Sequence, residues 1–111
     1  MNIVVVQGTL SSEPVERTLA GGVNIMNWEV TTIVDGRKRS VPVLWEEPTK
    51  RVQGFDEGDE VVVLGTVRRR FFQAGGITAS RTEVLADGVA KPTQKVGVAK
   101  LLDIARTQLA A

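Results

Sequence analysis

Short runs of β-branched residues, broken by glycine or a turn pair, occupy the chain from its start to about Val89. Such runs, bounded by turn residues such as Asp35-Gly36 and Gly75-Gly76, are typical of β-strands. Five segments predict strands: residues 2–10, 21–34, 38–47, 57–72 and 76–89. The chain is therefore expected to fold around a sheet.

Alternation within these segments predicts which side chains face the core, because successive residues of a strand point to opposite faces. The predicted core-facing residues are Val4, Val6, Gly8 and Leu10 in the first segment and Met26, Trp28, Val30 and Thr32 in the second.

The stretch PTKRVQGF, residues 48–55, predicts a short helix between the third and fourth strands, with Pro48 near its start and Gly54 near its end. Five strands with one helix at this place are typical of an all-β, Greek-key barrel of the OB-fold type. A β-sandwich would usually need more strands and has no place for that helix.

The composition changes after Ala90, which predicts a barrel domain over residues 1–90 and a hinge with a C-terminal helix over residues 91–111. Apolar residues recur there at helical spacing, at Val98, Leu101, Leu102, Ala105 and Leu109. We expect this amphipathic helix to lie on its own barrel or on a sister subunit.

The stretch GTVRRRFFQAGG, residues 65–76, places three arginines and two phenylalanines at the end of the fourth predicted strand. Alternation puts Arg68, Arg70 and Phe72 on one face, and Phe71 on the valine face, in the core. Arginine binds phosphate with paired donors, and an aromatic ring stacks a base at about 1–3 kcal/mol. The row therefore indicates a ligand that is both anionic and flat. Alternatively, the arginines are a solvated strand end that discourages aggregation.

Trp45 ends the third predicted strand and offers a second aromatic side chain at the rim of the sheet. A cationic loop, Arg37, Lys38 and Arg39, precedes that strand, and Arg81 lies on the fifth. We interpret these residues as an extension of the same binding surface.

Several functional classes are disfavoured by composition. The 111 residues include no cysteine and no histidine, and the acidic clusters EE and DEGDE have no catalytic partner beside them. We therefore expect no enzyme activity, no metal, no cofactor and no small-molecule substrate. The apolar run at residues 3–6 is too short for a signal peptide or a membrane span, so we expect a cytoplasmic protein that is not membrane-bound.

In order and spacing, the segments NIVVVQGTL, NWEVTT, VPVLWEE, EGDEVVVLGTVRRRFF and RTEVLADGV resemble the bacterial single-stranded DNA-binding proteins. The resemblance covers residues 1 to about 90. It implies a nucleoid-associated homo-oligomer, a dimer or a tetramer, that binds single-stranded DNA without strong sequence preference in replication, repair or recombination. By position, Trp45 and Phe72 resemble the family's stacking aromatics, and Arg68 and Arg70 its basic residues.

The departures from that family also carry expectations. Arg39 stands where the family often has a further aromatic, which implies more electrostatic binding. The acidic tail through which the family recruits enzymes is replaced by the helical segment, so the resemblance is to a short form without such recruitment. Two alternatives stay open: an assembly module resembling primosomal replication protein N, motivated by the helix, and an RNA binder, because stacking does not discriminate sugars.

Overall fold

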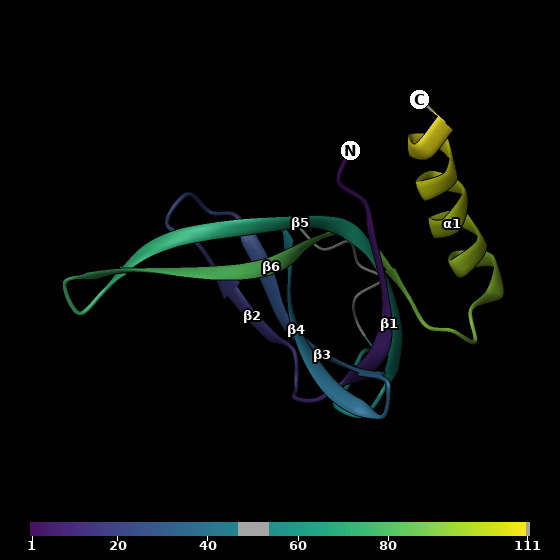
Figure 1. Ribbon diagram of the computed structural model, residues 1–111, viewed down its shortest axis with the longest axis horizontal. Coiled ribbons are helices and arrows are strands. Elements are labelled where there is room, and N and C mark those ends of the chain that lie inside the picture. Colours follow the sequence, from purple (N-terminus) through teal and green to yellow (C-terminus); the bar gives the residue numbers. More distant parts are fainter. Residues whose placement is uncertain (47–53, 111) are drawn as a thin grey trace.

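The structure, a computed structural model, describes residues 1–46 and 54–110 (Figure 1). It is mostly β, with one helix at the C-terminal end of the described chain. The elements are β1 (Val4–Leu10), β2 (Val15–Thr18), β3 (Asn24–Val34), β4 (Arg37–Glu46), β5 (Glu60–Ala74), β6 (Ile77–Ala90) and α1 (Lys95–Ala110).

The strands form one six-stranded sheet in the order β1-β5-β6-β4-β3-β2. At its C-terminal end β1 also pairs with β3, Thr9 opposite Thr31 and Leu10 opposite Val30, which closes a five-stranded barrel. This confirms the predicted closed β-barrel with a C-terminal helix, and the architecture is consistent with the OB fold. The strand β2, which extends the sheet beside β3, was not predicted. The predicted short helix at residues 48–55 falls almost entirely outside the described residues.

The barrel interior is the larger of two apolar clusters. Its buried side chains come from every barrel strand and from the segment before β5, and they include Leu10, Trp28, Val30, Val43, Val61, Val63 and Val84. Alternation in β1 and β3 therefore predicted the core face correctly. The start of β5, through Val61 and Val63, is the part of this strand whose inner face lies in the barrel interior.

The second cluster lies outside the barrel, where α1 covers β5 and the end of β6 (Figure 1). Leu101 and Ala105 of the helix are buried with Val62 and Leu64, whose side chains point away from the barrel interior. Of the two predicted docking places, its own barrel or a sister subunit, the structure shows the helix on its own barrel. Of the predicted stripe, Leu102 and Leu109 are exposed. No helix among the described residues has the length and hydrophobicity needed to cross a membrane.

Candidate nucleic-acid interface

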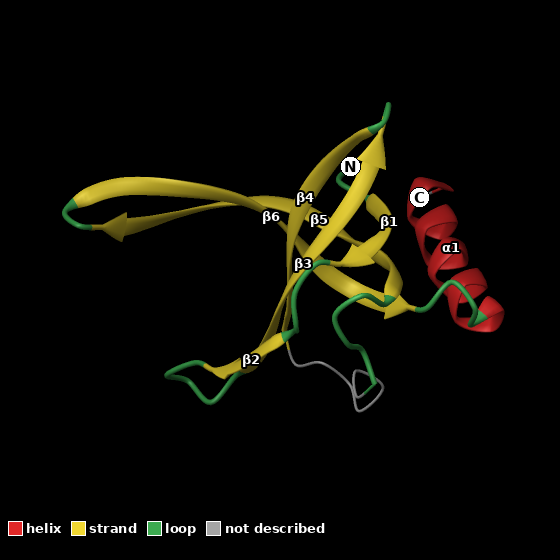
Figure 2. Ribbon diagram, turned by 90° about the horizontal axis from the view of Figure 1, so that it is seen from below, coloured by secondary structure: helices red, strands yellow, loops and turns green. Residues whose placement is uncertain are grey.

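Beyond the barrel, β5 and β6 continue as a two-stranded hairpin, residues 66–84, which we call the arm (Figures 1 and 2). Pairing of β1 with β5 extends as far as Gly65, and β6 meets β4 at Val84 and Leu85. From there the two strands pair with each other out to Ala74 and Ile77. Figure 2 shows that the arm projects away from the barrel and from α1. Most of its side chains are therefore exposed, and they are exposed on both faces.

One face of the arm, which we call the outer face, carries the predicted row. The register places Arg68 opposite Glu83, Arg70 opposite Arg81, and Phe72 opposite Ala79. Phe72 is 39% exposed, and the guanidinium carbon of Arg70 lies 5.6 Å from the centroid of its ring. The predicted arrangement, in which a ring and a cation share one accessible face, is present in the structure.

The arginines of the outer face are bound to carboxylates that the sequence analysis did not assign to the site. Glu83 is only 3% exposed, and its Oε1 atom lies 3.3 Å from Nε of Arg68 and 3.1 Å from Nε of Arg70. Arg68 also lies 3.8 Å from Glu46. The carboxylate of Glu83 offsets part of the positive charge and fixes the direction of both guanidinium groups.

A second ion pair continues the outer face from the arm onto the barrel wall. Nη2 of Arg81 donates to Oε1 of Glu29 at 3.0 Å, and the hydroxyl of Ser40 donates to Oε2 of the same carboxylate at 2.8 Å. These residues come from β6, β3 and β4. The outer face therefore runs without interruption across three neighbouring strands.

The predicted cationic loop is the tight turn between β3 and β4. Asp35 and Gly36 both have positive φ, 51° and 73°, as the turn of a two-residue hairpin requires. Arg37, Lys38 and Arg39 follow it, are exposed, and form no ion pair with the described part of the chain. Both ribbon views place this turn and the tip of the arm at separate ends of the molecule (Figures 1 and 2). The structure therefore separates two of the predicted basic groups.

Trp45 does not lie at the surface as predicted. It is 8% exposed and belongs to the barrel core, with its ring edge-on to Trp28 at a centroid distance of 5.9 Å. The physical reason is alternation in β4, where Trp45 follows Val41 and Val43 on the inward face. Charged neighbours in the sequence are a poor guide to the side on which a strand residue points. Trp45 therefore lies outside the exposed row of the arm, and its ring borders the pocket between the barrel and α1.

Phe71 was assigned to the core, and this assignment is wrong because its side chain is 66% exposed. It does share the face of Val61 and Val63, but the barrel ends before the strand reaches it. Val67, on the same face, is already exposed. The inner face of a strand is buried only as far as other strands cover it.

The sequence does contain a signal for the missed partner Glu83. A two-residue turn at Gly75-Gly76 sets the register of the hairpin, and counting back from it puts Glu83 directly opposite Arg68. Glu29 is harder to find, because its contact with Arg81 crosses from β3 to β6 over an intervening strand. That pairing depends on the barrel topology.

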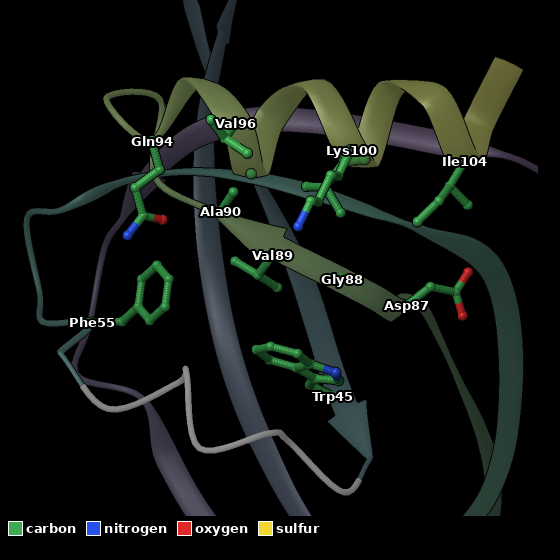
Figure 3. Close-up of a pocket in the computed structure, with 12 residues that line it drawn as sticks. Trp45, Phe55, Asp87, Gly88, Val89, Ala90, Gln94, Val96, Lys100 and Ile104 are labelled. Carbon is green, nitrogen blue, oxygen red and sulfur yellow. The ribbon is translucent and has the colours of Figure 1, made fainter.

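A pocket of about 620 Å³ lies between α1 and the end of the barrel (Figure 3). Trp45, Phe55 and Val89 line its barrel side, and Lys100 and Ile104 come from the helix. The described residues contain no group of three or more acidic side chains that could hold a metal ion. The pocket is mostly apolar, and none of the predicted basic residues lines it.

Comparison with known proteins gives no further assignment: no family model and no curated protein matches this chain.

Proposed function

We propose that this protein binds single-stranded nucleic acid, DNA in the first place, with little sequence preference, on an OB-fold barrel whose arm supplies the contact. The observation that carries the proposal is the accessible ring of Phe72 with the Arg70 guanidinium beside it on the outer face. A ring accepts any base by stacking, and a guanidinium accepts the neighbouring phosphate. This pair of chemistries fits a single strand, because the bases of a duplex are already stacked on each other.

Local charge supports the same proposal although the chain as a whole carries only +1. The arm contains four arginines and one glutamate, Arg68, Arg69, Arg70, Arg81 and Glu83. Binding of phosphates to such a segment releases counterions, so affinity falls as the salt concentration rises.

The buried Glu83 helps to position the proposed site. Arg70 contacts it through Nε, and a guanidinium has four further N–H donors that can reach a phosphate. Because Glu83 holds two arginines at once, their side chains lose less conformational freedom when a ligand binds. We assign Glu83 a positioning role and Phe72 and Arg70 the direct contacts.

The assembly-module alternative was motivated by an unpartnered apolar stripe on the C-terminal helix. The centre of that stripe, Leu101 and Ala105, is buried against the barrel of the same chain. This leaves the alternative with less support than nucleic-acid binding. Single-stranded RNA offers the same bases and phosphates as single-stranded DNA, so it is the competing ligand, and the binding experiment compares RNA with DNA directly.

The proposal is tested by fluorescence anisotropy with labelled oligo-deoxythymidine, a matched duplex and single-stranded RNA, at low and moderate salt. We expect salt-sensitive binding to the single strand and little to the duplex. Phe72→Ala should weaken binding to the outer face of the arm about 5- to 150-fold, the usual range for one stacked base. Val96→Ala, which removes an exposed apolar side chain of α1 remote from the arm, is the control and should change nothing. Absence of binding to all three ligands at low salt would overturn the proposal.

A further inference from the structure

The face of the arm opposite to Phe72, which we call the reverse face, carries a second aromatic side chain with a second cation. The register places Arg69 opposite Thr82 and Phe71 opposite Ser80. Phe71 is 66% exposed, against 39% for Phe72. The Phe71 ring therefore offers more accessible surface for stacking than the Phe72 ring does.

The geometry of this second pair closely repeats that of the first. The guanidinium carbon of Arg69 lies 5.5 Å from the centroid of the Phe71 ring, and Nη2 of Arg69 donates to the hydroxyl of Ser80 at 3.1 Å. Each face of the arm therefore has one ring with a guanidinium beside it, at nearly the same separation.

The two faces differ in their carboxylates. Arg70 is bound to Glu83, whereas Arg69 has no ion pair with any residue between 1 and 46 or 54 and 110. The cross-strand neighbours on the reverse face, Thr78, Ser80 and Thr82, are neutral hydrogen-bonding residues. A phosphate would meet no internal competitor for Arg69.

We propose that Arg69 and Phe71 bind a second segment of single-stranded nucleic acid, so that the arm lies between two segments held on its opposite faces. This inference rests on the proposed function, and it adds a site on a face that the first contact cannot reach. A second protein copy is the less favoured occupant. A stable protein interface buries on the order of 800 Å² per partner with an apolar centre, and one ring beside a cation on a two-stranded ribbon does not supply this.

The test counts short oligonucleotides on each protein chain. Oligo-deoxythymidine of about eight nucleotides, shorter than many single-barrel sites, is titrated and the complexes are counted by native mass spectrometry. We expect two oligonucleotides per chain for the wild type and one for Phe71→Ala and for Phe72→Ala. In each variant the remaining site should bind the oligonucleotide with an affinity within about twofold of the wild-type value. The reason is that free-energy changes at separate, independent sites add without coupling.

Arg69→Ala supplies a second variant for the reverse face and should also remove one oligonucleotide, while Val96→Ala should remove none. All four side chains are exposed, and circular dichroism verifies that each variant is folded. One oligonucleotide per wild-type chain, or two on Phe71→Ala, would overturn the inference. The inference would also be overturned if Phe71→Ala changed the number of protein chains in the complex instead of the number of oligonucleotides per chain. The proposed function survives all of these results, and it falls only if the wild type binds no oligonucleotide.

Discussion

The two halves of β5 lie in opposite environments although they form one continuous strand. Residues 61–65 are buried on both faces, by the barrel core on the inside and by α1 on the outside. Residues 67–74 lie beyond β1 and α1 and are largely exposed, Arg68 being half-buried. The apolar side chains of the first half therefore stabilise the fold, whereas the rings of the second half are available for binding. Four predictions test how sharp this division is.

The largest effect is expected from a truncation in the covered half. Leu64, on the face of β5 that α1 covers, is almost completely buried. Leu64→Ala should therefore lower the free energy of unfolding by about 3 kcal/mol. Phe71→Ala, in the uncovered half, removes a larger side chain and should change it by less than about 0.5 kcal/mol. Urea denaturation measures both. Similar losses for the two variants would show that the arm contributes to the core after all.

Gly65 marks the boundary between the two halves, at a β-bulge where β6 carries one extra residue, Asp87. A Cβ atom at this position would overlap the backbone carbonyl oxygen of Leu85, which cannot rotate away. Gly65→Ala should therefore lower the free energy of unfolding by about 1–3 kcal/mol.

The control for this prediction is Gly21→Ala, where a Cβ atom would meet nothing and φ is not positive. We expect its urea midpoint to match that of the wild type within error. If Gly65→Ala were equally neutral, the close approach of β5 and β6 would not constrain the boundary.

The same division explains what could be predicted from the sequence. Period-two alternation identified the barrel strands and the burial of Trp28, because each strand has a local signature. The row of Arg68, Arg70 and Phe72 follows from alternation alone, and the structure keeps these residues on one face. These features require no knowledge of what lies across the strand.

Local sequence patterns did not predict correctly whether the side chains of Phe71 and Trp45 are buried. What they lacked was how far other strands and the helix cover each strand. Phe71 has the alternation of a core residue, yet the strand has left the barrel at this point. Trp45 has the charged sequence neighbours of a surface residue, yet β4 is still covered. Both errors arise because burial depends on long-range pairing, which a local pattern does not contain. The carboxylate partners of the arginines were missed for the same reason.

A smaller effect is expected from the carboxylates that partner the outer-face arginines. Glu29 accepts a hydrogen bond from Arg81 in a half-exposed ion pair. Glu29→Gln removes the negative charge but keeps an acceptor oxygen, so it should bind that guanidinium less strongly and leave it more available to phosphate. Exposed ion pairs contribute about 0.2–1 kcal/mol, which corresponds to an increase in affinity for oligo-deoxythymidine of up to about fivefold. Fluorescence anisotropy at low salt measures this change.

Glu16→Gln is the matched control, because it alters net charge equally and Glu16, on β2, has no ion pair with the described residues. If both variants raised affinity by the same factor, the gain would come from net charge. The ion pair on the outer face would then have no specific effect on binding.

The smallest effect is expected at the β3–β4 turn, and it defines how far the binding surface extends beyond the arm. Lys38 shares by alternation the face of Ser40, whose hydroxyl contacts Glu29, so it lies on the outer face. If a bound strand runs from Phe72 across the barrel wall to this turn, Lys38→Ala should reduce the slope of log affinity against log salt by about 0.7, the value for one phosphate contact on a single strand.

Arg106→Ala, which removes an exposed cation of α1, should leave the slope unchanged. A slope unaffected by Lys38→Ala would confine the bound strand to the arm, because a charge that contacts no phosphate releases no counterion. The uncovered half of β5 would then contain the whole binding surface.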